Sequence, residues 1–160
     1  AIENGGTSGT LGIEKEPRIF RAKEKLAPIV CYESIYGDFV SKQVKQGAPF
    51  LTVITNDGWW GDSPGYKQHF SFSSLRAIEN RRWVIRSANT GKSGVFDEYG
   101  RIKKETKYWK EAAFSYSIPL LDGRTTFYTK HGDYIGVLSA FLFILILITT
   151  IVKVILSKKK

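Results

Sequence analysis

An uninterrupted apolar run near the C-terminus limits what this chain can be. Residues 135–152 read IGVLSAFLFILILITTIV and contain no charged side chain. Crossing the hydrocarbon core of a bilayer takes about 20 apolar residues at ~1.5 Å each. Residues 154–156 extend the run past Lys153, whose long side chain can reach the headgroups. A buried helix of a soluble domain would show a polar face, which this run lacks. We therefore expect a transmembrane helix over residues 134–156.

The residues that flank this run predict its orientation. The tail at residues 157–160 reads Ser-Lys-Lys-Lys, and lysines in a short flank stay on the cytoplasmic side. The other flank, residues 130–134, is mixed in charge and ends in an interfacial tyrosine. We expect a cytoplasmic tail at 157–160, and residues 1–133 outside the cytoplasm.

The composition fits a folded domain. Of 160 residues, 42% are hydrophobic and 14% aromatic, which argues against disorder. The chain begins with Ala1, contains no methionine and opens with no targeting segment. We therefore expect it to be a C-terminal piece of a longer protein.

The formal net charge of +9 raises the question of nucleic-acid binding. Four lysines flank the apolar run, however, and no basic stripe interleaved with aromatics occurs elsewhere. A membrane surface is the better explanation, and no nucleic-acid partner is expected. Cys31, His69 and His131 lack metal-ligand spacing, so neither a metal nor a cofactor is expected.

The first 133 residues alternate between predicted strands and helices. Helices are predicted over 34–46, closed by Gly47, and over 66–82, with Phe70, Leu75 and Ile78 on one side. Turn formers predict a loop over 56–65. Strands are predicted over 26–31, 50–55, 83–88, 93–97, 101–108 and 113–118. The pattern is that of an α/β layered domain, with helices expected on both faces of the sheet.

Cys31 is the chain's one cysteine, and most such residues are small core side chains. It ends a predicted strand and precedes a predicted helix, however, and α/β proteins place their chemistry at that edge of the sheet. Backbone N–H groups from Tyr32 onward would stabilise an oxyanion there, and the same field favours a thiolate. The position makes Cys31 a candidate nucleophile.

Five sequence blocks in fixed order carry a resemblance. The blocks are Ile29-Val30-Cys31-Tyr32-Glu33, Thr55-Asn56-Asp57-Gly58-Trp59-Trp60-Gly61, Gln68-His69, Arg76-Ala77-Ile78-Glu79-Asn80-Arg81-Arg82 and Asn89-Thr90-Gly91. With these blocks and the terminal helix, the chain resembles the apolipoprotein N-acyltransferase family of the nitrilase (carbon-nitrogen hydrolase) superfamily over nearly its whole length.

This resemblance implies the C-terminal half of an αββα sandwich, spanning residues 1–133, followed by one transmembrane helix. It implies an enzyme in which the cysteine takes a fatty acyl chain from a phospholipid as a thioester. The chain then passes to the α-amine of an apolipoprotein's diacylglyceryl-cysteine. It also implies a bacterial inner-membrane protein, multi-pass in its longer form, with a periplasmic catalytic domain. The family's Glu base and Lys are expected upstream of this chain, so the 160 residues alone should be inactive.

Further site residues follow from the same blocks. Glu33 is expected beside the nucleophile in catalysis, and Tyr32 and Asn89 are expected to line the substrate site. Trp59 and Trp60 lie in a glycine-flanked loop, and paired tryptophans are common at membrane interfaces. The loop is therefore interpreted either as a lipid-facing lid over the substrate site or as a buried corner of the domain. We interpret His69 as a hydrogen-bonding structural residue, Asn56 and Asp57 as turn formers, and Arg76, Glu79 and Arg82 as an intrahelical pairing set.

Two alternatives remain open from the sequence. A nitrilase-type amidase would use the same cysteine thioester but pass the acyl group to water. A membrane-tethered domain without catalysis would form no thioester and transfer no acyl group. The apolar run and the Trp59-Trp60 loop favour a lipid substrate over a soluble amide.

Overall fold

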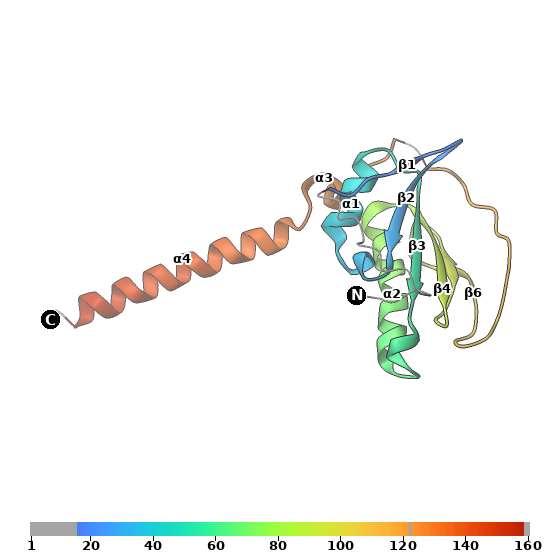
Figure 1. Cartoon of the computed structure of the whole chain (residues 1–160). Helices are drawn as coiled ribbons and strands as arrows, with labels where there is room; N and C mark the ends of the chain where they lie inside the picture. The colour runs from blue at the N-terminus through green and yellow to red at the C-terminus, as the bar shows by residue number, and fades with distance from the viewer. Residues whose placement is uncertain (1–15, 122, 159–160) are drawn as a thin grey trace, which may run out of the picture.

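The computed structural model describes residues 16–121 and 123–158 and contains one mixed six-stranded sheet in the order β1-β2-β3-β4-β5-β6 (Figure 1). The three central strands are parallel, and β1, β5 and β6 pair antiparallel. The strands are β1 (Phe20–Arg21), β2 (Lys25–Val30), β3 (Phe50–Asn56), β4 (Trp83–Asn89), β5 (Gly94–Phe96) and β6 (Ile102–Glu105). The predicted α/β class is confirmed.

Two helices connect the parallel strands. Helix α1 (Gly37–Lys45) lies between β2 and β3, and α2 (Pro64–Asn80) lies between β3 and β4. Each is preceded by a short 3₁₀ helix, η1 (Cys31–Ile35) and η2 (Gly58–Trp60). Ser63 caps α2 by accepting from the Gly65 N–H, and the predicted stop after α1 is confirmed by Gly47 at φ +94°.

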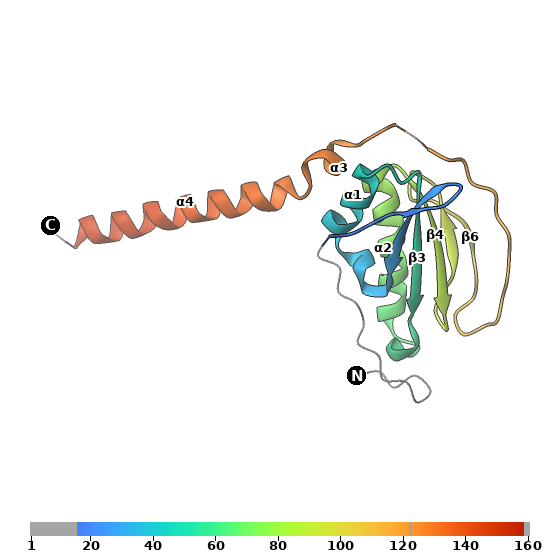
Figure 2. The same ribbon diagram turned by 45° about the horizontal axis from the view of Figure 1, so that its top comes forward.

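Both helices cover the same face of the sheet, as Figure 2 shows. Alternate strand residues point toward them, because side chains on a strand alternate between faces. The shared core is lined by Ala27, Ile29, Leu51, Val53, Val84 and Phe96 from the strands and Val40, Val44, Phe70 and Ala77 from the helices. The expectation of helices on both faces is wrong.

In the described residues, the opposite face of the sheet is exposed and partly apolar at β2 and β3, whereas Trp83 of β4 on this face is 9% exposed and its ring lies 6.0 Å from that of Tyr116. Val30 and Ile54 are paired in register, and they are 58% and 60% exposed. A strand with apolar residues on both faces normally packs on both sides. One helical layer on one sheet is half of the αββα sandwich, in which a second sheet would cover such a face.

Several predicted elements differ from the structure. The helix predicted from residue 34 starts as η1, and Tyr36 in extended conformation separates it from α1. The strand predicted over 101–108 shortens to β6, and residues 113–118 form no strand but lie in an extended segment that arches past the β6 edge (Figures 1 and 2). Leu75 and Ile78 are 41% and 42% exposed, so they do not share the buried side of Phe70.

The C-terminal helix is joined to the domain through a short helix. Helix α3 (Phe127–His131) packs on α1 and α2, and the Thr129 hydroxyl donates to Asn80 Oδ1 over 2.9 Å. The Ser41 hydroxyl of α1 donates to the same oxygen over 3.1 Å. Buried Asn80 therefore ties three helices together directly before α4 begins.

Helix α4 (Tyr134–Ser157) is 24 residues long and projects away from the domain (Figure 1). It is long and apolar enough to cross a membrane, with a mean hydropathy of 2.8. The Thr149 and Thr150 hydroxyls donate to the Ile146 carbonyl, which satisfies them without water. Lys159 and Lys160 of the predicted tail lie outside the described residues.

The two faces of β3 predict contrasting effects of truncation. Leu51→Ala should lower the free energy of unfolding by about 2–5 kcal/mol, because Leu51 is fully buried and its loss leaves a cavity. Ile54→Ala, on the open face of the same strand, should cost much less. Urea unfolding in detergent, followed by tryptophan fluorescence, measures both. Equal losses would contradict the assignment of the faces.

Candidate active site

Cys31 sits where β2 ends and η1 begins, in an uncommon backbone conformation. Its φ is +50°, in the left-handed region that non-glycine residues rarely adopt. Strain of this kind costs of order 1–3 kcal/mol and clusters at functional sites. The turn leaves the thiol half-buried at the carboxyl end of the parallel strands, as the sequence predicts.

The local hydrogen bonds stabilise this turn. Glu33 Oε2 accepts from the Val30 N–H over 2.7 Å, and the Ser34 hydroxyl donates to the Cys31 carbonyl over 2.8 Å. The structure thus engages the Glu33 carboxylate with the backbone that precedes Cys31. Because η1 is a 3₁₀ helix and α1 starts only at Gly37, the expected field of a long helix directly after Cys31 is absent in this part of the structure.

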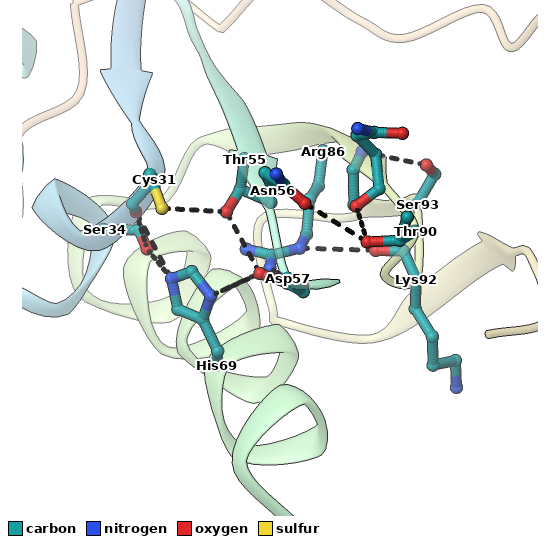
Figure 3. Close-up of polar contacts among 12 residues, drawn as sticks. Cys31, Ser34, Thr55, Asn56, Asp57, His69, Arg86, Thr90, Lys92 and Ser93 are labelled. Atoms are coloured by element: carbon teal, nitrogen blue, oxygen red, sulfur yellow. Dashed lines mark hydrogen bonds and ion pairs between the residues drawn. The ribbon is translucent and has the colours of Figure 1, made fainter. Parts of the chain in front are cut away.

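A buried cluster of charged and polar side chains lies behind Cys31 (Figure 3). Asp57 accepts from His69 Nδ1 through Oδ1 and from Arg86 Nη2 through Oδ2, each over 2.8 Å. Asp57 is fully buried, His69 is 2% exposed and Arg86 1%. His69 Nε2 lies 3.0 Å from Ser34 Oγ and 3.3 Å from the Cys31 carbonyl oxygen. We call Thr55, Asp57, His69 and Arg86 the buried cluster.

Thr55 joins this cluster to the thiol. Its hydroxyl lies 3.2 Å from Cys31 Sγ and 3.0 Å from Asp57 Oδ1. The cluster therefore reaches Cys31 twice, through Thr55 at the sulfur and through His69 and Ser34 at the carbonyl.

The charges of the cluster stabilise one another. Burial alone would raise the pKa of Asp57, but the hydrogen bond from His69 and the positive charge of Arg86 outweigh it, so this pKa lies below its usual value. Burial lowers the pKa of Arg86, against the opposing effect of Asp57 and of negative charge on Cys31.

The Asn89-Thr90-Gly91 block makes room for Asp57. The Asp57 N–H donates to the Asn89 carbonyl over 3.3 Å, and a Cβ added to Gly91 would overlap the Asp57 carboxylate. Gly91 therefore has no side chain because the backbone passes close to a buried charge.

The predicted substrate-binding residues are placed differently from one another. Tyr32 is half exposed beside Cys31, and its ring lies 6.0 Å from that of His69. Trp59 is 69% exposed, whereas the Trp60 ring packs against Gly65 at the start of α2. Trp59 therefore fits a lipid-facing position, and Trp60 fits a buried corner.

Asn89 lies at the end of β4, where it lines a cavity of about 370 Å³ together with Thr90, Trp109 and Lys110. Cys31 does not line this cavity. The structure thus brings Tyr32 and Glu33 close to Cys31 and sets Asn89 in a neighbouring hollow.

Sequence reasoning missed most of the buried cluster. The sequence predicts Asp57 as a turn former and does not indicate a role for Thr55 or Arg86, whereas the structure joins all three in one buried cluster. His69 is confirmed as a hydrogen-bonding residue, and the Arg76–Glu79 pair is confirmed at 2.9 Å, whereas Arg82 lies beyond the end of α2 and donates to the Ala48 carbonyl. An arginine inside the apolar strand 83–88 was the available indication, because such a charge needs a buried partner.

The cluster predicts a pH-dependent stability. Asp57→Asn should cost about 3–5 kcal/mol near neutral pH, because Arg86 loses its charged partner in a buried site. Because the pKa of Asp57 is lowered in the folded state, its contribution is present above the unfolded value of about 3.9 and is lost as pH falls through the folded value. The difference in the free energy of unfolding between the parent protein and Asp57→Asn should therefore disappear only in acid.

Urea unfolding at neutral and acid pH measures this gap. Asp62→Asn, an exposed site in the same connection between β3 and α2, is the matched control and should change little at either pH. An Asp57→Asn protein as stable as the parent at neutral pH would contradict the assignment.

Known proteins resemble the chain in sequence and in fold. An apolipoprotein N-acyltransferase from Chlorobaculum tepidum is 47% identical over 111 residues, which are 69% of this chain and 21% of that protein. Apolipoprotein N-acyltransferase 2 from Leptospira interrogans is 40% identical over 121 residues, 74% of this chain and 20% of that protein. The chain thus spans about a fifth of the length of these relatives.

The fold matches a crystal structure of a carbon-nitrogen hydrolase from Helicobacter pylori G27. The TM-score is 0.57 at 15% identity, over 64% of this chain and 43% of that chain, which shows a shared fold alone. The sequence pattern of the carbon-nitrogen hydrolase family matches residues 7–126, three quarters of the chain. The chain belongs to the carbon-nitrogen hydrolase family.

Proposed function

We propose that this chain is part of an N-acyltransferase that moves a fatty acyl chain from a phospholipid to the N-terminal diacylglyceryl-cysteine of apolipoproteins. The observation that carries the proposal is that one chain joins a strained, strand-end cysteine to a 24-residue apolar helix. The names of the two relatives at 47% and 40% identity support it. A hydrolase of soluble amides would need no such helix.

The reaction proceeds in two steps through Cys31. Its thiolate attacks the ester carbonyl of the phospholipid, the carbon–oxygen bond breaks, and the lysophospholipid oxygen takes the proton that the thiol has lost. The lipoprotein amine then attacks the thioester, the carbon–sulfur bond breaks with its electron pair on sulfur, and the amine loses a proton as the amide forms. Glu33, which we propose acts in catalysis beside Cys31, also holds the turn that presents the sulfur. We propose that Tyr32 and Trp59 contact the lipid.

The first test follows the acyl group. The protein as it occurs in its membrane is incubated with phospholipid labelled in the acyl chain, then treated with neutral hydroxylamine, which cleaves thioesters. Label should attach to the parent protein, leave with hydroxylamine, and be absent from Cys31→Ala. Cys31→Ser should be nearly as inactive, because an alkoxide is far less accessible than a thiolate at neutral pH.

A diacylglyceryl-cysteine peptide added to the labelled protein should take the label into a hydroxylamine-resistant amide. Label that resists hydroxylamine on the protein, or that also appears on Cys31→Ala, would refute the thioester. Release of the label as free fatty acid, with none on the peptide, would favour the amidase alternative.

We also propose that α4 spans the bacterial inner membrane with residues 157–160 in the cytoplasm and the domain in the periplasm. A lysine at the centre of a span costs about 2.5–3.5 kcal/mol on insertion scales, so three lysines are hard to carry across. Neutral residues at 158–160 should weaken orientation without abolishing insertion, because hydrophobicity drives the latter.

The topology is tested by measuring whether a membrane-impermeant thiol reagent labels a reporter cysteine in intact spheroplasts. The reporter is Lys160→Cys in a Cys31→Ala background, compared with and without lysis. Labelling only after lysis is expected. Labelling of intact spheroplasts would place the tail outside and the domain in the cytoplasm.

A further inference from the structure

The hydroxyl of Thr55 lies between two acceptors but has one hydrogen to donate. Thr55 is 6% exposed near the end of β3, and its Oγ1 lies 3.2 Å from Cys31 Sγ and 3.0 Å from Asp57 Oδ1 (Figure 3). A hydroxyl donates one hydrogen bond and accepts up to two. The state of the sulfur therefore decides which way the Thr55 hydrogen points.

Asp57 is fixed whichever way that hydrogen points. Its two oxygens keep the bonds from His69 Nδ1 and Arg86 Nη2, each at 2.8 Å. The positive charge of Arg86 and the bond from His69 hold the pKa of Asp57 low despite burial, so at neutral pH it is an acceptor and carries no proton to give. Losing the Thr55 hydrogen leaves the carboxylate still paired.

Three forms of the sulfur then call for different partners. A thiol donates weakly, so Cys31 S–H can point at Thr55 Oγ1 while Thr55 donates to Asp57. A thiolate is a charged acceptor, and hydrogen bonds to ionised groups are about twice as strong as neutral ones. A thioester sulfur is a weak acceptor, and the hydrogen returns to the Asp57 carboxylate.

We propose that Thr55 is a catalytic residue that stabilises the Cys31 thiolate, and that Asp57, anchored by His69 and Arg86, is the positioning residue that holds the hydroxyl in reach of the sulfur. This inference rests on the proposed role of Cys31 as acyl-accepting nucleophile. The thiolate is both the form that attacks the phospholipid ester and the form that leaves when the thioester breaks. Thr55 therefore assists both steps without giving up its proton.

Other charged and titratable groups surround the sulfur but make different contacts. Glu33 accepts from the Val30 N–H, Tyr32 is half exposed, and Arg86 bonds Asp57. His69 reaches the Cys31 carbonyl rather than the sulfur. In the described part of the chain, Thr55 Oγ1 is the hydroxyl within hydrogen-bond distance of Sγ.

The experiment measures the reactivity of Cys31 with iodoacetamide against pH, which needs no lipid. It uses the protein in its membrane, with the matching Cys31→Ala protein subtracted as background. Thr55→Val keeps the shape of the side chain and removes the hydroxyl. Thr55→Ser keeps the hydroxyl. Thr52→Val is the matched control, because Thr52 lies on the same strand and its hydroxyl donates to the Ala27 carbonyl over 2.8 Å, away from Cys31.

Thr55→Val should move the midpoint of the pH profile upward by about one unit, which is about tenfold slower alkylation on the acidic limb with the same alkaline plateau. Thr55→Ser and Thr52→Val should follow the parent profile. A merely structural role for Thr55 would lower the plateau or leave the midpoint in place, and either result would overturn the proposal. A shift of equal size in Thr52→Val would do so as well.

Thr55→Ala, with the same expected shift, replaces Thr55→Val if the latter does not fold as judged by circular dichroism. The result is separable from the acyl-labelling assay. An upward shift without any acyl label on Cys31 would refute the proposed function and leave the thiolate contact standing. Acyl label on Cys31 with no shift in Thr55→Val would refute the role of Thr55 alone.

Discussion

The ion pair between Asp57 and Arg86 is the interaction on which this site depends. Both side chains are almost fully removed from water, which costs several kcal/mol per charge unless each is closely paired. Arg86 lies in the middle of β4, and Asp57 follows the end of β3. The pair forms where these strands, the turn at Gly91 and helix α2 with His69 meet in one arrangement. Because burying either charge unpaired is costly, the ion pair constrains how these strands and helix α2 pack together.

That geometry explains how a strained cysteine is maintained. A left-handed residue costs about 1–3 kcal/mol and persists where its surroundings over-determine it. Cys31 is held at its carbonyl by Ser34, with His69 close by, at the preceding N–H by Glu33, and at its sulfur by Thr55. These groups come from η1, α2 and β3, so no single element sets the conformation of the nucleophile. The proposed chemistry and the fold share the same contacts.

Helix α4 is coupled to the domain by polar contacts as well. Asn80 accepts from Ser41 of α1 and Thr129 of α3, and the Asp133 N–H that precedes α4 donates to Asp38 of α1 over 3.0 Å. Asn80 ends α2, the helix that also carries His69. The same helix therefore contributes to the cysteine site at one point and to the attachment of α4 at another.

Properties that depend on neighbours along the chain were predictable. The apolar run that became α4, the central strands and the strand-end position of Cys31 all follow from local hydrophobicity and turn residues. The absence of a helix from the second sheet face in the described residues was not, because Val30 and Ile54 make their strands apolar on both sides whether or not a helical layer covers them. The sequence also could not predict two sets of contacts. One is the bond of Glu33 to the backbone, and the other is the cluster of Thr55, Asp57, His69 and Arg86. Asp57 and Arg86 are 29 residues apart, and a buried charge selects its partner only once strand register and helix packing have excluded water from both.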